Sequence, residues 1–315
     1  MRVLRTVWDP VFAGLVLIAA IHGACSRGNT AVPPTPAAAS QALLSAGPDP
    51  SKAVAYICPM DRDIRSNAPG KCSRCGMDLV AGVPEPVEFH LDLTVAPQPP
   101  KPNEPAELTF AVFDPWKNNP VTKFSMVHER LFHAFVVSRD LQFFVHDHPV
   151  WQNGVFQDRI SFPKPGMYRI LSDFYPEAAT PQLLTQTVFV DGPEPPVSPL
   201  PRDDAPKAAE NVGVAVSVSP NDPIAGMTTQ MRFVLNPPDG IERYLGAWGH
   251  MLLVSDDLID MIHTHPSMAD GSAQIQFNLV FPRARTYRLW VQFQRNGIVN
   301  TAHFDIPVKS TERPS

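Results

Sequence analysis

The chain has 315 residues, of which 18% are charged, 44% are hydrophobic and 36 are prolines, and its net charge at pH 7 is −5. The hydrophobic content is sufficient for a packed core and excludes wholesale disorder, while proline breaks helix interiors and central strands, which argues against a mostly helical protein. The negative charge gives no general attraction to nucleic acid. We therefore expect an all-β, multi-domain protein that does not bind nucleic acid.

The N-terminal segment resembles the export signal of a bacterial lipoprotein. A basic start with Arg2 and Arg5 is followed by the apolar run Val11–Ile21 and by small residues before Cys25. This order is typical of a secretory signal, and a cysteine directly after Gly-Ala resembles the lipobox, in which that cysteine is lipidated. We expect a signal peptide at residues 1–24 and a lipid on Cys25. An uncleaved N-terminal anchor helix is the alternative, and either would place the chain on the periplasmic side of a bacterial membrane or at the cell surface.

Residues 25–54 are rich in alanine, proline, serine and glycine and have no hydrophobic periodicity. Such a composition does not provide a core and is typical of a flexible linker. We expect this segment to be a tether between the membrane and the folded part.

Three cysteines follow in a pattern that suits a metal ion. Cys72 and Cys75 form a Cys-x-x-Cys turn, and Cys58 precedes them. With Cys25 lipidated, an odd number of cysteines remains, which argues against a plain disulfide framework. Thiolate sulfur favours Cu(I) and Zn(II), and Met60 and Met77, each two residues beyond a cysteine, add thioether sulfur that suits Cu(I). The pattern predicts a thiolate metal site.

Residues 56–80 resemble the heavy-metal-binding domain, a YHS- or TRASH-like metal ribbon attached to copper-exporting P-type ATPases and to adaptor proteins of metal efflux systems. The family pattern, Cys-Pro-Met-His-Pro and then Pro-Gly-x-Cys-Pro-x-Cys-Gly-Met-x-Leu, is matched at Cys58, Pro59, Met60, Pro69, Gly70, Cys72, Cys75, Gly76, Met77 and Leu79. The resemblance implies a metal ribbon over residues 55–82, with metal-efflux components as partners. The histidine of the pattern is Asp61 here, so the fourth ligand is left open between Asp61 and Met60.

Two other interpretations of these cysteines stay open. The ribbon could hold a structural zinc ion without a transport role. In an oxidising compartment, Cys72 and Cys75 could instead form a disulfide.

The rest of the chain contains an internal repeat. Residues 132–149 align without a gap to residues 249–266, and residues 162–170 match residues 281–289. These are short alternating runs bounded by Pro, Gly, Asn and Asp, which is typical of antiparallel strands. We expect a small metal ribbon followed by two tandem immunoglobulin-like or cupredoxin-like β-sandwiches. The expected boundaries are residues 86–191 and 209–309 for the sandwiches, 192–208 for a proline-rich linker, and 310–315 for a disordered tail.

Each repeat carries a predicted hairpin with three histidines. If the first hairpin turns at Arg139-Asp140, or through a four-residue loop with the same register, Val137 pairs with Gln142. His133 then lies opposite His146, and His148 emerges from the same face. In the second copy the equivalent pairing places His250 opposite His263, with His265 on the same face. Three imidazoles on one face can share an ion, and imidazole ligands on a rigid sheet favour Cu(II).

The same hairpin faces also carry large apolar side chains. Phe135, Val137 and Phe144 alternate with the first set of histidines, and Leu252, Val254 and Met261 with the second. The faces are therefore expected to point into the core of each sandwich, with the histidines as hydrogen-bonded polar residues at its rim as the alternative to metal ligands. The additional candidate ligands are Met126 and His128 for the first site and His303 for the second.

The chain contains no Ser-His-Asp order, nucleophile elbow, phosphate loop or dinucleotide fingerprint, so we do not expect an enzyme. The expected function is that of an exported, membrane-tethered heavy-metal-binding protein in metal resistance or trafficking. Its expected ions are Cu(I) at the cysteines and Cu(II) at the histidines, with zinc as the alternative. The competing interpretation is a non-catalytic envelope assembly or interaction lipoprotein with a structural zinc ribbon.

Overall fold

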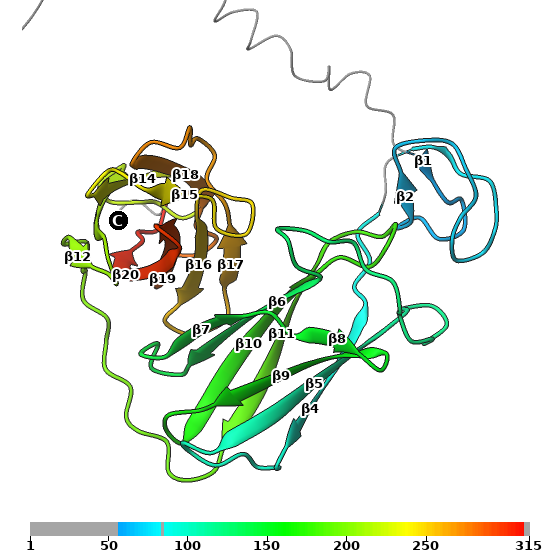
Figure 1. The fold of residues 1–315 in the computed structure, drawn as a ribbon, viewed down its shortest axis with the longest axis horizontal. Helices are drawn as coiled ribbons and strands as arrows, with labels where there is room; N and C mark the ends of the chain where they lie inside the picture. Colours follow the sequence, from blue (N-terminus) through cyan, green and yellow to red (C-terminus); the bar gives the residue numbers. More distant parts are fainter. Residues whose placement is uncertain (1–55, 83–84, 312–315) are drawn as a thin grey trace, which may run out of the picture. The chain divides into compact units, whose positions relative to one another are not determined.

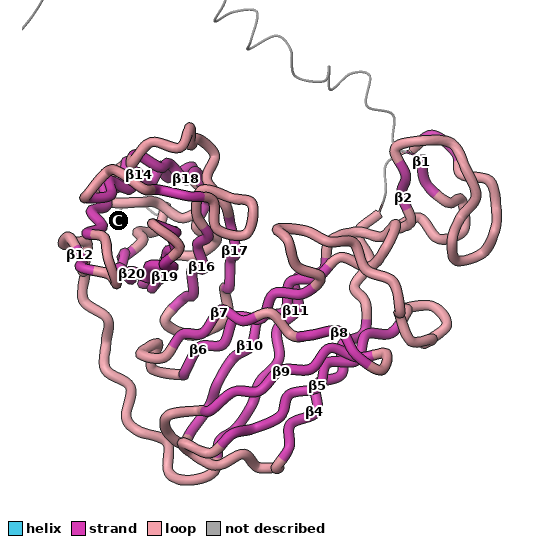
Figure 2. Tube along the Cα trace, viewed as in Figure 1, coloured by secondary structure: helices cyan, strands magenta, loops and turns pink. Residues whose placement is uncertain are grey.

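The computed structural model describes residues 56–82 and 85–311, which form twenty β-strands and contain no helix (Figures 1 and 2). Within these ranges there is accordingly no helix that is long and apolar enough to cross a membrane. The expectation of an all-β fold is confirmed. The predicted signal peptide, Cys25 and the tether at residues 25–54 lie outside the described residues, as do residues 312–315 of the predicted tail.

The N-terminal ribbon is a sheet of three two-residue strands in the order β2-β1-β3. Proline and glycine punctuate this segment, and Gly76 adopts a φ of 78°, which L side chains rarely adopt, after the Cys-x-x-Cys turn. The buried side chains Cys58, Ile64 and Cys72 join the core cluster of the following domain. So small a unit cannot bury enough apolar surface by itself. The strands are β1 (Tyr56–Ile57), β2 (Arg65–Ser66) and β3 (Val80–Ala81).

The first repeat is a sandwich of two four-stranded antiparallel sheets, ordered β4-β5-β9-β8 and β11-β10-β6-β7. Its core contains a cluster of aromatic rings, in which Phe132 stacks on Phe174 with centroids 5.2 Å apart and lies 4.8 Å from Phe156. The strands are β4 (His90–Ala96), β5 (Pro105–Phe113), β6 (Phe132–Ser138), β7 (Phe144–Asp147), β8 (Val150–Gln152), β9 (Val155–Ser161), β10 (Gly166–Phe174) and β11 (Gln182–Val190).

The second repeat has the same plan. One sheet is ordered β12-β13-β14-β18, and the other is ordered β15-β19-β16-β17 with β20 also paired to β19. Alternating burial along β14 and β18 directs Phe233 and Phe277 into the core. The strands are β12 (Lys207–Ala208), β13 (Gly213–Ser219), β14 (Thr228–Asn236), β15 (Ile241–Glu242), β16 (His250–Ser255), β17 (Met261–Thr264), β18 (Gln274–Val280), β19 (Thr286–Arg295) and β20 (Ile298–Pro307).

The register predicted for the histidine hairpin is wrong by two residues. In the first repeat, Val137 pairs with Phe144 rather than with Gln142, and His146 lies opposite Phe135 rather than opposite His133. Because side chains alternate with a period of two, a shift of two residues leaves every side chain on its predicted face. The histidines therefore still share one side of the hairpin.

The cause of the different register is the turn. The loop comprises four residues, with Leu141 at a φ of 57° and the Ser138 amide donating to the Phe143 carbonyl over 3.2 Å. The Ser138 hydroxyl donates to Asp140 over 2.6 Å, which holds the loop closed. The second repeat has the equivalent loop, and Val254 pairs with Met261 there.

The apolar side of each hairpin was expected to face the core of its own sandwich, and this expectation is wrong. These side chains form a third cluster that combines residues of both repeats, so each hairpin face is covered by the equivalent face of the other repeat. Phe144 stacks on Trp290 in this cluster, with ring centroids 4.9 Å apart. The buried members are Phe135, Val137, Leu141 and Leu171 from the first repeat and Leu252, Val254, Leu258, Met261 and Trp290 from the second.

A buried ion pair of the second repeat also donates a hydrogen bond to the first repeat. Arg288 in β19 donates to both carboxylate oxygens of Asp305 in β20, over 2.6 and 2.7 Å, and its remaining terminal nitrogen donates to the Leu141 carbonyl of the first repeat over 2.8 Å. Burying two charges is costly, and only a bidentate pair with further hydrogen bonds offsets that cost. Here the guanidinium has all of these partners.

Replacing Asp305 by alanine is expected to lower the free energy of unfolding by about 3–5 kcal/mol, because it leaves the Arg288 charge buried and unpaired. Urea denaturation of the full chain measures this change. The matched control is Asp222→Ala, which removes an exposed partner of Lys309 and Arg202 and is expected to lower the free energy of unfolding far less, because exposed ion pairs contribute little to stability. Equal losses for the two variants would contradict the structural role of the buried pair.

Candidate metal centre

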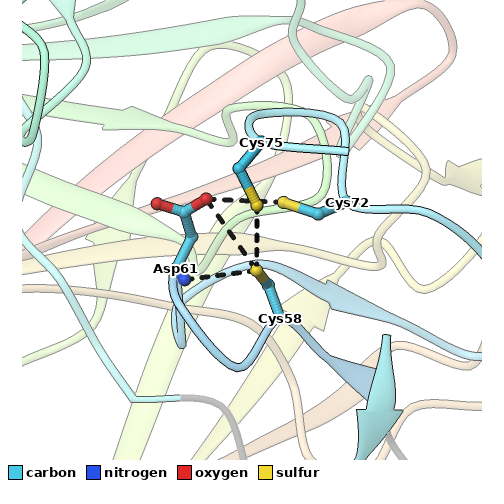
Figure 3. Close-up of side chains that lie close together, drawn as sticks. All are labelled: Cys58, Asp61, Cys72 and Cys75. Atoms are coloured by element: carbon cyan, nitrogen blue, oxygen red, sulfur yellow. Dashed lines mark hydrogen bonds between the residues drawn. The ribbon is translucent and has the colours of Figure 1, made fainter. Parts of the chain in front are cut away.

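Four side chains of the ribbon converge on one point. Cys58, Asp61, Cys72 and Cys75 each present a ligand atom, and these atoms all lie within 4.8 Å of one another. Figure 3 shows the three sulfurs and one carboxylate oxygen of Asp61 turned toward a common space. Cys58 comes from the residues after β1, and the other two cysteines come from the Cys-x-x-Cys turn.

The backbone of the ribbon holds the thiols in this arrangement. The Cys58 amide donates to the Ile64 carbonyl over 3.2 Å, which folds the segment after β1 back on itself. The Asp61 amide donates to the Cys58 sulfur over 3.2 Å. The Gly76 amide donates to the Cys72 carbonyl over 2.9 Å and closes the second turn. Amide donors that point at sulfur favour the thiolate, which is the form that binds metals.

The thiols differ in acidity. Burial acts to raise the pKa of Cys58, but hydrogen bonds from the backbone of Asp61 and Met60 and from neighbouring thiols outweigh it and lower that pKa. At Cys75 a backbone hydrogen bond at Met77 acts in the lowering direction, yet burial and the surrounding acidic groups raise the pKa to about 12. A metal ion that binds here must therefore displace a proton from Cys75.

Asp61 is the fourth group of the centre. Its Oδ2 lies 3.5 Å from the Cys72 sulfur and 3.9 Å from the Cys58 sulfur, while its Oδ1 pairs with Arg74 at 3.3 Å. Burial acts to raise the pKa of Asp61, but hydrogen bonds from Cys75 and Arg74 and the charge of Arg74 lower it. The carboxylate is thus ionised and directed at the thiols.

Met60 and Met77, the two candidate thioether ligands, lie at the surface of the ribbon. Their side chains are exposed, at 65% and 41% respectively. Asp61, in contrast, is 5% exposed and presents a carboxylate oxygen to the thiols.

The sequence interpretation missed Arg74, which lies inside the Cys-x-x-Cys turn. It forms ion pairs with Asp61, with the fully buried Asp63 at 2.9 Å and with Asp114 of the first repeat at 2.6 Å. Its positive charge offsets part of the negative charge that three thiolates and a carboxylate would gather. The available signal was an arginine between two cysteines, with acidic residues at both 61 and 63.

The donor set fits a soft metal ion. All three described cysteines are free thiols, so the alternative of a Cys72–Cys75 disulfide is not observed. The Cys58 and Cys75 sulfurs lie 3.4 Å apart, close to the separation of about 3.8 Å that two 2.3 Å metal–sulfur bonds give at a tetrahedral angle. Three sulfurs and one oxygen complete four-coordination without a large rearrangement.

The structure also brings together each trio of histidines. In the first repeat, His133 Nδ1 and His146 Nε2 are 3.1 Å apart, and His148 joins them with ligand atoms within 4.8 Å. In the second repeat, His250 Nδ1 lies 3.3 Å from His263 Nε2. The same His250 nitrogen lies 3.0 Å from His265 Nε2.

The additional candidate ligands are placed differently from the expectation. His128 was expected at the first site, but it groups with His250 and His265 of the second repeat and stacks on His265 with ring centroids 3.8 Å apart. Met126 is 69% exposed. His303 pairs with Trp290 across β19 and β20 and belongs to neither group of ligand atoms found among the described residues.

Burial favours the neutral form of four clustered histidines, His133, His148, His250 and His265. Burial lowers the pKa of His133 to about 4, and burial together with neighbouring imidazoles lowers the pKa of His148 and of His265 to about 3. The pKa of His250 is lowered further by the same causes. Neutral imidazole is the form that ligates metal ions.

Comparison with known proteins finds no curated relative and only distant matches among solved structures. No curated protein matches the chain. The adhesin InvE of Yersinia pseudotuberculosis matches at 13% identity over 70% of this chain and 60% of its own, with a TM-score of 0.22. An ice-binding adhesin of an Antarctic bacterium matches at 10% identity over 72% and 50%, with a TM-score of 0.24. The FN1–FN3 domains of chicken CNTN1 match at 10% identity over 76% of each chain, with a TM-score of 0.21.

The chain thus spans less than two thirds of the length of either adhesin chain, and likenesses of this size carry no information on function.

Two family models match the sequence itself. Residues 55–81 match the heavy metal binding domain, in agreement with the resemblance expected from the cysteine pattern. Residues 87–191 and 208–310 each match a domain of unknown function, DUF8832. These two copies cover more than half of the chain and coincide with the two sandwiches. The chain therefore belongs to the DUF8832 family and carries two copies of that domain after a heavy metal binding domain.

Proposed function

We propose that this chain is an exported, membrane-tethered heavy-metal-binding protein that holds copper as Cu(I) at Cys58, Cys72 and Cys75 and acts in metal resistance or trafficking. The observation that carries the proposal is the convergence of three free thiols within a segment that matches the heavy metal binding domain. Thiolate sulfur is the ligand that Cu(I) prefers.

Several features of the ribbon support copper. Cys75 is partly exposed, so an ion or a partner can reach the thiols from solvent. Met60 and Met77, which follow Cys58 and Cys75 by two residues, have exposed side chains. Their thioether sulfur binds Cu(I) but is a poor ligand for Zn(II). The ribbon would then accept Cu(I) and pass it to metal-efflux components.

The alternative proposal is a structural zinc ion in an envelope interaction lipoprotein. The observation that favours it is Asp61, because an ionised carboxylate as the fourth group suits Zn(II) better than Cu(I). A zinc ion would also supply the stability that so small a ribbon lacks. The sandwiches would then bind another envelope protein, and neither proposal involves catalysis.

Replacing Cys72 by serine is expected to lower the Cu(I) affinity of the full chain by at least about tenfold, because it removes one of three thiolate ligands. Competition with a Cu(I) chelator under reducing conditions measures this, and circular dichroism checks that the sandwiches stay folded. The neighbouring Ser73→Ala is the matched control and is expected to keep the wild-type affinity. Unchanged competition by the Cys72 variant would exclude the thiolate site.

The Asp61→Asn variant separates the two ions. If the site is built for Cu(I), the three thiolates suffice and the Cu(I) affinity is expected to change by less than about tenfold. A site built for zinc loses an ionised ligand, so its Zn(II) affinity falls by more than that. Asp78→Asn, which alters an exposed partner of Lys71, is the control. A large Cu(I) loss in Asp61→Asn alone would argue against the three-thiolate Cu(I) site.

Export and anchoring form the last part of the proposal, and they are supported by the sequence around Cys25. Radiolabelled palmitate is expected to enter the wild-type chain and the Cys72→Ser variant equally in a bacterial host, and to be absent from Cys25→Ala. A label that persisted in Cys25→Ala would contradict lipidation of this residue.

A further inference from the structure

The histidine trios of the two repeats lie against each other. Ring centroids of His133 and His250 are 6.3 Å apart, those of His133 and His263 are 6.0 Å apart, and those of His146 and His250 are 5.8 Å apart. Two trios that are far apart in sequence therefore make one cluster between the repeats. Its members are His128, His133, His146, His148, His250, His263 and His265.

Hydrogen bonds fix where the protons of the first pair are. His133 Nε2 lies 3.1 Å from the Val127 carbonyl, which can only accept, so this nitrogen carries the proton. His146 Nδ1 lies 2.7 Å from Gln292 Oε1, and the amide nitrogen of Gln292 lies 3.1 Å from the Thr301 hydroxyl; with the amide in this orientation, His146 Nδ1 donates to Gln292 Oε1 and carries the proton. In a neutral imidazole the other nitrogen then bears a lone pair. His133 Nδ1 and His146 Nε2 thus present two lone pairs to each other across 3.1 Å.

The second pair repeats this arrangement. His250 Nε2 donates to the Tyr244 carbonyl over 2.9 Å, and His263 Nδ1 donates to the Asp173 carboxylate over 2.7 Å. His250 Nδ1, the nitrogen left with a lone pair, therefore faces His263 Nε2 at 3.3 Å. Two imidazole nitrogens at this distance can share either a proton or a metal ion, so each pair offers two nitrogen ligands at a spacing that suits one ion.

The groups that orient these rings are exchanged between the repeats. Gln292, in β19 of the second repeat, holds His146 of the first repeat. Asp173, at the equivalent place in β10 of the first repeat, holds His263 of the second. A metal-ligating histidine almost always donates its outer N–H to a carboxylate, a carbonyl or a comparable acceptor. Each repeat therefore completes the ligand support of the other.

Further imidazoles are available as ligands. The Nε2 atom of His148 is buried and has no hydrogen-bond partner among the described residues. His265 Nε2 lies 3.0 Å from His250 Nδ1, and His128 is stacked on the His265 ring. Each facing pair thus has at least a third nitrogen nearby.

We propose that the two repeats jointly build an imidazole-only metal centre for divalent first-row transition ions such as Cu(II), Zn(II) or Ni(II). Its two donor sets are His133, His146 and His148 on one side and His250, His263 and His265, with His128, on the other. Imidazole nitrogen suits these divalent ions, whereas the thiolates of the ribbon suit Cu(I). The centre is thus separate from the ribbon, and the bound ions stabilise the contact between the repeats.

The test uses the full chain with all four cysteines replaced by serine, so that only non-thiolate ligands remain. Titration with Cu(II) is expected to give an electron paramagnetic resonance spectrum with nitrogen hyperfine coupling and a higher Tm, because ligands that bind only the folded state stabilise it. His148→Gln is expected to weaken Cu(II) binding by at least about tenfold, and the ring Nε2 that it removes has no hydrogen-bond partner among the described residues. The matched control is His90→Gln, an exposed histidine outside the cluster.

The exchanged support gives a second readout. Asp173→Asn is expected to lower Cu(II) affinity by about 10–100-fold and to change the nitrogen coupling in the spectrum, although Asp173 belongs to the other repeat from the ring it holds. If Asp173 positions the His263 ring, Asp173→Glu is expected to restore Cu(II) affinity, because it restores the carboxylate. The Tm of the metal-free Asp173→Asn chain is the check on folding, because a loss of fold alone would lower it.

A cysteine-free chain that binds Cu(II) with no nitrogen coupling, or does not bind it, would overturn the shared centre. Equal affinities of His148→Gln and His90→Gln would do the same. Neither result would touch Cu(I) binding by the ribbon, which is measured on the chain with its cysteines, so the two proposals fail or stand separately.

Discussion

Each repeat has a hairpin whose inner face is apolar at one end and carries three imidazoles at the other, and this face has to be covered. Leaving it in water would expose a contiguous apolar patch, and the equivalent hairpin of the second repeat is the surface that covers it. Phe144 and Trp290 stack at the apolar end, and His146 and Gln292 meet at the polar end. One contact therefore determines how the repeats associate and brings the histidines together.

The sequence predicts much of this architecture. Alternating apolar runs predicted the strands, the repeat predicted two related sandwiches, and the cysteine spacing predicted the metal ribbon that the family model confirms. The hairpin register was wrong because the loop lies between the paired residues Ser138 and Phe143, whereas both the two-residue turn and the four-residue loop considered from the sequence pair Val137 with Gln142. Leu141 adopts a positive φ in this loop, a conformation that is uncommon for leucine. The partner of the hairpin face was also wrong, because an apolar pattern indicates burial but not which surface provides it.

The groups that support the two candidate centres were the hardest to foresee. Arg74, which pairs with Asp61 of the ribbon, is also held by Asp114, 40 positions away in the sequence. Asp173 contacts His263 across the contact between the repeats. Such pairs depend on tertiary packing, and a charged residue in a strand is usually no more than a solvated side chain. The ligand residues themselves were easier to predict, because metal chemistry restricts their type and spacing.

Asp173 and Gln292 each support a histidine of the other repeat, and this arrangement has a consequence for a duplicated domain. The two residues occupy equivalent places in β10 and β19 but differ in charge, so a carboxylate supports one imidazole where a neutral amide supports the other. A carboxylate makes the ring it holds a more basic ligand. The duplication has thus produced two inequivalent halves: the proposed set around His263 would bind the first ion more strongly, and the set around His146 would fill only at a higher metal concentration.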